Sequence, residues 1–146
     1  MSKQLPTMAR IGTIFLTWRR YQQRDILSHK ITLKQLYVLR QLARKDFLYP
    51  SQIADMLYCD RPTATVVIGN MTREGWVTRE KDPENAKQIR VSLTEKGRNK
   101  LLAIDNDAAS REGSAFDPLS CFSAEEKNQL DLLLTKLSKH LSKLEG

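Results

Sequence analysis

The sequence predicts a mainly α-helical fold with one small antiparallel β-ribbon and long helices at both ends of the chain. Two observations predict it. Apolar residues recur at three- and four-residue steps over most of the 146 residues, which is the spacing of a buried helix face. Residues 76–93 instead hold two short strand-like segments around a turn. The length suits one hydrophobic core, so we expect a single domain over residues 1–146.

The first two predicted helices are marked by an apolar stripe and by a start signal. Residues 9–27 form an amphipathic helix, because the arginines lie off its apolar stripe. Thr32-Leu33-Lys34-Gln35 is a capping box, in which the threonine hydroxyl accepts an orphan amide and the glutamine reaches back. The apolar positions are Ile11, Ile14, Phe15, Trp18 and Tyr21 in the first helix and Leu36, Leu39 and Leu42 in the second.

Two shorter helices separated by a tight turn follow. Tyr49-Pro50-Ser51-Gln52 opens the first, because proline fits the first helical position. The chain turns at residues 58–59, Asp60 caps the second helix, and Gly75 ends it after about residue 74. The inward-facing positions are Ile53, Ala54 and Leu57 in the first helix and Ala64, Val67, Ile68 and Met71 in the second.

The ribbon and two further helices complete the chain. Residues 76–79 and 88–93 read as strands, and residues 82–85 have the composition of a turn. Thr94 caps a fifth helix that runs to near Gly113, residues 113–122 form a loop, and Ser123-Ala124-Glu125-Glu126 is the capping box of a sixth helix. The apolar positions are Leu101, Ile104 and Ala108 in the fifth helix and Leu130, Leu133, Leu134, Leu137, Leu141 and Leu144 in the sixth.

A helix, a turn, a second helix and a ribbon, in this order, make a winged helix-turn-helix. We therefore expect residues 31–99 to form that lobe and residues 1–30 plus 100–146 to form a helical dimerisation region. A leucine stripe as continuous as the last one usually needs a partner helix, which a second copy of the chain would supply. Packing of this stripe within one chain is the alternative.

The net charge of +7 is concentrated in the first two-thirds of the chain. Residues 1–49 hold ten Lys/Arg against two Asp/Glu, residues 50–100 hold nine against seven, and residues 101–146 hold five against eight. A positive field of this kind attracts polyanions such as nucleic acid. A solubilising surface explains the charge equally well, so charge alone decides nothing.

Missing motifs argue against several classes of function. The sequence has no glycine-rich phosphate loop, no GxSxG and no metal-ligand spacing, so we expect neither an enzyme nor a cofactor nor a metal site. Cys59 and Cys121 lack CxxC spacing, which argues against a disulfide framework. No apolar run approaches the ~18 residues of a membrane span, and the N-terminus has no secretory pattern. We therefore expect a cytoplasmic protein with no membrane partner.

The chain resembles the MarR family, the multiple-antibiotic-resistance-type regulators, over nearly its whole length. Each matching motif is weak, but their order and spacing together are specific. The resemblance implies winged-helix homodimers, most often repressors, that release DNA on binding a small aromatic effector or an oxidant. The motifs are Thr32-Leu33 with Gln35, Ile53-Ala54, Arg61-Pro62-Thr63-Ala64-Thr65, Gly75-Trp76-Val77-Thr78-Arg79, Asp82-Pro83 and Val91-Ser92-Leu93-Thr94-Glu95-Lys96-Gly97.

In a helix-turn-helix the N-terminal part of the second helix enters the major groove of double-stranded DNA. Arg61 would then fork onto a guanine edge, threonine or valine methyls would contact a thymine methyl, and Asn70 would read adenine or hold a phosphate. Some of these residues would touch only phosphate or solvent. The candidate DNA contacts are Gln52, Arg61, Pro62, Thr63, Thr65, Val66, Asn70, Arg73, Arg79, Lys87 and Arg90.

The ribbon is where this chain departs from the family. Related sequences usually carry Asp-x-Arg after the turn, with the Arg in the minor groove and the Asp paired to a basic residue at the position of Arg79. Here these positions hold Asn85 and Lys87, which leaves Asp82 as the carboxylate available for an ion pair. Lysine is more strongly hydrated than arginine, so we predict weaker or less shape-selective wing contact.

Two features are candidates for a switch. Trp18, Tyr21 and Tyr37 are aromatic residues that would line a ligand pocket between the dimer helices and the lobe, although ordinary core packing explains their spacing better. Cys59 lies beside a helix start and Arg61, which favour a reactive thiolate, but Asp60 opposes this effect. A packed, inert thiol is the reading we favour.

We therefore expect a sequence-specific DNA-binding transcriptional regulator, a homodimeric repressor of a pseudo-palindromic operator that is released by a small-molecule or redox signal. The alternative is a helical dimeric protein-interaction scaffold without specific DNA binding. The salt dependence of DNA affinity separates the two, because phosphate contacts release counterions.

Overall fold

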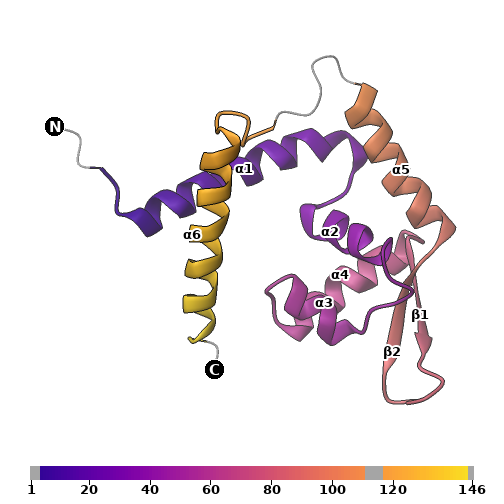
Figure 1. Ribbon diagram of the computed structural model, residues 1–146. Helices are drawn as coiled ribbons and strands as arrows, with labels where there is room; N and C mark the ends of the chain where they lie inside the picture. Colours follow the sequence, from indigo (N-terminus) through magenta and orange to yellow (C-terminus); the bar gives the residue numbers. More distant parts are fainter. Residues whose placement is uncertain (1–3, 111–116, 145–146) are drawn as a thin grey trace. The chain divides into compact units, whose positions relative to one another are not determined.

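The computed structural model describes residues 4–110 and 117–144, and the chain divides into two units, residues 1–107 and residues 108–146. The two-stranded sheet among the helices confirms the predicted mainly α fold class. The second unit holds α6 (Ala124–Ser142) (Figure 1). The first holds α1 (Thr7–Ile26), the 3-10 turn η1 (Leu27–His29), α2 (Leu33–Leu42), α3 (Pro50–Met56), α4 (Arg61–Arg73), β1 (Val77–Lys81), β2 (Ile89–Leu93) and most of α5 (Glu95–Ser110).

One hydrophobic core joins α2, α3, α4, β2 and α5 in the first unit. The inward-facing residues predicted for the second, third and fourth helices are buried or half-buried, as are Leu101 and Ile104 of α5. Burying one such side chain stabilises a fold by roughly 1.5–3 kcal/mol. The largest fully buried side chains are Val38, Leu39, Leu42, Ile53, Ile68, Met71 and Val91.

The predicted helix ends are confirmed by their hydrogen bonds. The Thr32 hydroxyl accepts the Gln35 amide at 3.1 Å while the Gln35 side chain accepts the Thr32 amide at 3.0 Å. The Ser123 capping box at the start of α6 has the same reciprocal bonds. Gly75 has a φ of 79°, the left-handed conformation expected of a helix stop.

The ribbon is shifted slightly from its predicted position. β1 pairs antiparallel with β2, from Val77 opposite Leu93 to Lys81 opposite Ile89, so the first strand begins after Trp76 rather than at it. Trp76 is buried, and its backbone NH bonds to the carbonyl of Met71 in α4. The tryptophan therefore closes the helix end instead of starting the strand.

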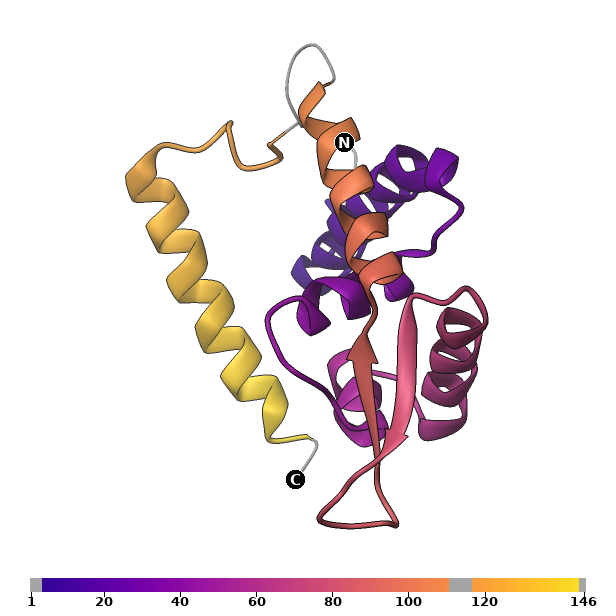
Figure 2. The same cartoon turned by 90° about the vertical axis from the view of Figure 1, so that its right-hand side faces the viewer.

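A third chain segment is attached to the ribbon. Leu48, just before α3, forms an antiparallel bridge with Val91, and its NH and CO make backbone bonds of 2.9 and 2.8 Å. Two perpendicular views show the β1–β2 turn extending beyond α3 and α4 (Figure 2). This turn with its two strands is called the wing below.

The junction between the wing and α5 requires a glycine at position 97. Thr94 caps α5 as predicted, since its hydroxyl accepts the Gly97 amide at 2.9 Å. A Cβ placed on Gly97 would lie 2.1 Å from the carbonyl oxygen of Trp76, so only glycine fits there.

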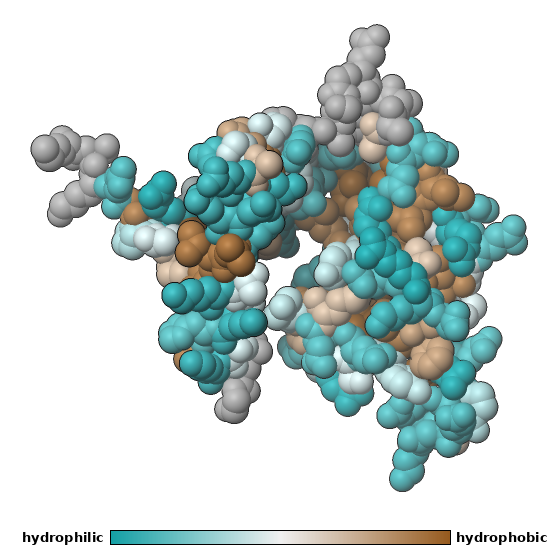
Figure 3. Space-filling view, in the orientation of Figure 1, coloured by the Kyte–Doolittle hydropathy of each residue, from teal (hydrophilic) through white to brown (hydrophobic). Residues whose placement is uncertain are grey.

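The terminal helices expose much of their apolar surface. α1 buries only Ile26 among its residues, and Ile14 and Phe15 are exposed. Hydrophobic side chains gather on the middle of α6, whereas the end of the wing is hydrophilic (Figure 3). Within α6 no residue is buried, and the exposed leucines are Leu132, Leu133, Leu134 and Leu141, followed by Leu144 beyond the helix end.

The structure describes the connection between α5 and α6 only in part. Residues 117–122 form turns, as expected for a loop. The end of the fifth helix near Gly113 lies outside the described residues. Among the described residues, no helix combines the length and the apolar character needed to cross a membrane.

Candidate nucleic-acid interface

The start of α4 is organised by its own cap. Asp60 Oδ1 accepts the Thr63 amide at 2.7 Å. Hydrogen bonds from Thr63 lower the pKa of Asp60 below its ordinary value, and the positive charge of Lys34 acts in the same direction. The Asp60 side chain is therefore held ionised at the mouth of the helix. It occupies the amide that an anion would otherwise bind.

The turn before α4 places this start at the surface. Tyr58 adopts a left-handed conformation with φ 51° and is exposed. A left-handed backbone costs a non-glycine residue about 1–2 kcal/mol, and it produces a tight turn between α3 and α4. The predicted turn at residues 58–59 is thus confirmed, with the strain carried by Tyr58.

The outward face of α4 carries most of the predicted contacts. Arg61, Pro62, Thr65 and Arg73 are exposed, and Thr63 and Asn70 are half-buried. Val66 is 61% exposed although it lies in a helix whose opposite face is fully buried. An aliphatic side chain held open beside basic and hydroxyl groups suits contact with base methyl groups.

Two of these side chains are already hydrogen-bonded within α4. The Thr65 hydroxyl donates to the Arg61 carbonyl at 2.9 Å. Arg73 donates to the Asn70 side-chain oxygen, which joins these two residues on one turn of the helix. Asn70 therefore has its amide NH₂ as the group that remains to donate to a base or a phosphate.

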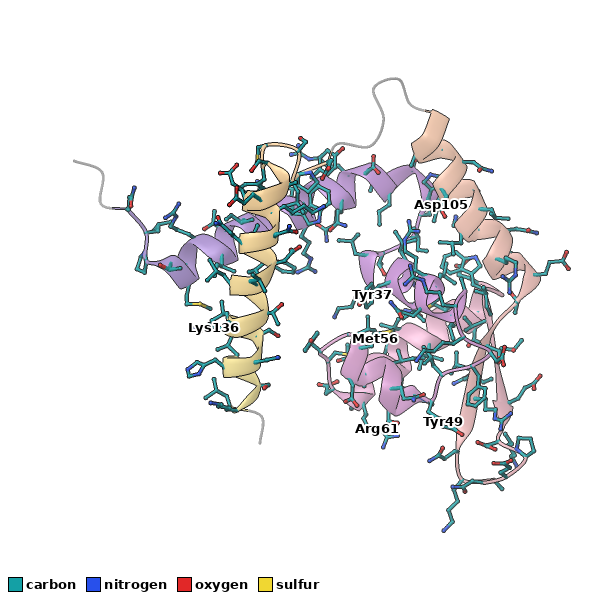
Figure 4. All side chains as sticks on the ribbon, viewed as in Figure 1. Tyr37, Tyr49, Met56, Arg61, Asp105 and Lys136 are labelled. Carbon is teal, nitrogen blue, oxygen red and sulfur yellow. The ribbon has the colours of Figure 1, made fainter. Side chains whose placement is uncertain are left out.

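Gln52 in α3 has a similar divided role. Its side-chain oxygen accepts the Tyr49 amide at 2.9 Å and so caps α3, which leaves its NH₂ group as the donor for a phosphate. In Figure 4, Arg61 lies at the edge of the lobe from which the wing turn extends. The α4 start and the wing thus face the same side of the first unit.

The wing turn is shaped by Asn85. Its side chain accepts the Lys87 amide at 3.1 Å, its NH bonds to the Asp82 carbonyl, and its CO accepts the Gln88 amide. Short polar side chains stabilise such turns by bonding to the backbone two residues ahead. Lys87 is exposed on this turn and so is Arg79 on β1.

The base of the wing contains a buried carboxylate. Asp82 is 4% exposed and accepts hydrogen bonds from the Tyr49 hydroxyl at 2.5 Å, the Glu84 amide at 2.8 Å and Arg90 at 3.2 Å. The bond from Tyr49 is the largest cause that lowers the pKa of Asp82, and the same bond raises the pKa of Tyr49. The carboxylate offered for a pair with Arg79 thus pairs with Arg90 instead.

Arg90 is half-buried, with 28% of its side chain exposed, and its guanidinium is held by neighbouring side chains of the lobe. Its guanidinium lies 4.2 Å from the centre of the Phe47 ring, and Phe47 meets Tyr49 edge-on at 5.3 Å. Sequence reasoning overlooked the roles of Phe47, Lys34 and the Tyr49 hydroxyl, because these roles depend on residues far away in the sequence. A contact between residues 33 positions apart leaves no periodic signal in the sequence.

The predicted switch residues are placed as follows. Trp18 and Tyr21 stack on α1 with ring centres 5.3 Å apart, and Tyr37 on α2 is exposed. Cys59 is half-buried and packs against the hydrophobic core. Over residues 4–110 and 117–144, no three His, Cys, Asp or Glu side chains form a group suited to a metal ion.

A turn between α3 and α4, an outward helix face and an adjoining wing define the first unit as a winged helix-turn-helix. A model of the MarR family matches residues 31–89. The uncharacterized HTH-type transcriptional regulator YkoM of Bacillus subtilis is 32% identical over 117 residues, which are 80% of this chain and 74% of the relative. The chain belongs to the MarR family.

Two further comparisons agree with this assignment. The HTH-type transcriptional regulator PecS of Dickeya dadantii is 28% identical over 117 residues, which are 78% of this chain and 69% of the relative. A mutant of Escherichia coli MarR in complex with operator DNA shares the fold at 19% identity, with a TM-score of 0.77 over 91% of this chain and 94% of that one. The protein is thus a transcriptional regulator, as predicted, and not an enzyme.

Proposed function

We propose that the protein binds a pseudo-palindromic DNA operator as a homodimer and represses transcription there. The observation that carries the proposal is the outward face of α4, where exposed Arg61, Thr65 and Val66 lie over a fully buried opposite face. Arg61, at the start of this face, lies on the side from which the wing extends (Figure 4). A helix and a wing that face one side suit a major groove and its neighbouring minor groove.

Each part of the interface would have its own role. Arg61, Thr63, Thr65 and Val66 would read base edges, because they lie at the N-terminal end of α4. Phosphate contacts would come from Gln52, Asn70, Arg73 and Arg79. Pro62 would touch DNA only through its apolar ring, and Lys87 would approach the minor groove. Arg90 would support the wing from inside.

The dimer would be built from the chain ends. We assign residues 31–99 to DNA binding and residues 1–30 plus 100–146 to dimerisation, since the leucines of α6 and the apolar residues of α1 are exposed. Two copies would set their α4 helices about one DNA turn apart, ~34–36 Å. Sedimentation at micromolar concentration would detect this dimer; a monomer would remove the symmetry argument.

The test is selection of bound duplexes from random DNA, followed by affinity measurements across salt concentrations. We expect an inverted repeat and an affinity that falls steeply with salt, because a protein with 6–10 phosphate contacts loses roughly 10³–10⁵-fold between 50 and 200 mM salt. The matched control is Arg98→Gln on α5, an exposed cation of the lobe that is not among the proposed DNA contacts, which should retain the selectivity.

A protein-interaction scaffold would give a different outcome. It would enrich no sequence, and its DNA affinity would be weak and equal for all duplexes. That result would refute the regulator proposal and favour the scaffold.

The release signal is a separate part of the proposal. We propose a small aromatic effector or an oxidant, with Trp18, Tyr21 and Tyr37 as the ligand candidates and Cys59 as the redox candidate. Peroxide treatment of the wild type and of Cys59→Ser, followed by measurement of DNA release, tests whether Cys59 is the redox sensor. DNA release that persists in Cys59→Ser would eliminate Cys59, as would absence of release in the wild type.

A further inference from the structure

The wing is attached to the helix-turn-helix by a small polar cluster at its base. Within the described residues, Asp82 is the one charged residue that is buried. It follows the last residue of β1, and its backbone NH also bonds to the Gln88 carbonyl across the turn at 2.9 Å. A buried carboxylate is retained at low cost only when donors surround it, and three donors do so here.

One of these donors comes from outside the wing. Tyr49 immediately precedes α3, and its backbone is fixed by the Gln52 cap. Its hydroxyl reaches from the first helix of the helix-turn-helix to the carboxylate at the wing turn. Together with the Leu48–Val91 bridge, this bond fixes the wing at two points along one side.

Arg90 completes the cluster from β2. Its guanidinium bonds to Asp82 and lies over the Phe47 ring, while its Nε is buried without a hydrogen-bond partner. An arginine with these contacts is partly desolvated and is fixed in one orientation. A phosphate contact would instead leave the guanidinium at the surface.

We propose that Tyr49, Asp82 and Arg90 are positioning residues that set the direction of the wing relative to α3 and α4 and so determine how well Lys87 reaches DNA. None of the three touches DNA itself. The inference rests on the proposed function. Asn85 carries no charge and cannot form an ion pair that supports the wing, so this internal cluster supplies that support.

The test is a double-mutant cycle on the full-length protein with its selected duplex. Tyr49→Phe removes only the hydroxyl, and we expect it to weaken binding roughly three- to tenfold, the range that one hydrogen bond supplies. In a Lys87→Ala background the same substitution should change binding by less than about twofold, because the wing contact is already lost. Equal weakening in both backgrounds overturns the proposal, and so does an unchanged affinity.

Arg90 gives a second cycle with a different chemistry. Arg90→Lys keeps the charge but loses the planar group over Phe47, so a positioning role predicts weaker DNA binding than in the wild type. In the Lys87→Ala background the same substitution should make no further difference to the affinity. A direct phosphate contact would survive the change to lysine, and preserved affinity would contradict the inference. Tyr58→Phe, which removes an exposed hydroxyl, is the control and should bind like the wild type.

A measurement without DNA separates this inference from the proposed function. Amide ¹⁵N relaxation of the free protein should show lower order parameters at residues 84–88 in Tyr49→Phe than in the wild type, with those of α4 unchanged. Unchanged wing order parameters would sink the positioning role even if the wild type binds its operator. A wild type that selects no duplex would instead sink the proposed function.

Discussion

α4 and the wing face the same side of the first unit, but different interactions hold them there. α4 is capped by Asp60 from its own N-terminus and anchored by an apolar face that includes Ile68 and Met71. The wing depends on Tyr49 and Leu48, whose wing partners Asp82 and Val91 lie more than 30 positions further along the chain. The limits and the buried face of α4 are thus encoded locally, whereas the direction of the wing depends on partners far away in the sequence.

Truncation of the α4 anchor should have the largest effect. Met71 is fully buried, and Met71→Ala should lower the free energy of unfolding by about 2–5 kcal/mol through lost burial and a cavity. Chemical denaturation measures it. Val66→Ala on the exposed face is the matched control and should change stability by less than about 0.5 kcal/mol. Equal losses would mean that the two faces of α4 are not distinct.

Removal of the Arg61 side chain, the first of α4, should weaken DNA binding without changing the stability of the fold. Arg61 is exposed, and Arg61→Ala should weaken operator binding by about 1–3 kcal/mol while relaxing the preference at one base position. Competition assays with single-base operator variants measure both. Weakening that is equal for every duplex would assign Arg61 to phosphate.

The predictability of the two regions follows the same division. The cap, proline, apolar steps and final glycine of α4 lie within the 16 residues from Asp60 to Gly75, and they predicted its start, its end and its buried face. The wing was predicted as a ribbon, but its first strand was placed one residue early because Trp76 has a high strand propensity. The pairing of Asp82 with Tyr49 and Arg90 had no local signature, so the sequence left the carboxylate without its true partners.

Acid should test both regions through their carboxylates. The pKa values of Asp60 and Asp82 are lowered in the fold, so each stabilises the protein above the unfolded carboxyl pKa of about 3.9 and loses this contribution as pH falls through its folded value. The raised pKa of Tyr49 acts at the other end, because its contribution is lost as pH rises above about 10.

Melting temperatures across pH would measure these contributions. Asp60→Asn keeps a side chain that can cap α4 but removes the titrating group. Asp82→Asn likewise keeps a hydrogen-bond acceptor at the base of the wing and removes the titrating group. Each variant should show a smaller acid-induced fall in melting temperature below pH 4 than the wild type. An identical acid fall in Asp82→Asn would mean that the wing carboxylate contributes nothing through its charge.

The smallest expected effect lies at the wing turn. Lys87 is exposed there, and Lys87→Arg should tighten operator binding, because arginine is more weakly hydrated than lysine and enters a narrow groove more easily. The gain should be less than roughly tenfold, which corresponds to about 1.4 kcal/mol. Lys45→Arg, outside the proposed interface, should leave the affinity unchanged. If Lys87→Arg binds no better than the wild type, Lys87 does not reach the groove, and α4 must supply the specific contacts without a wing that reads DNA.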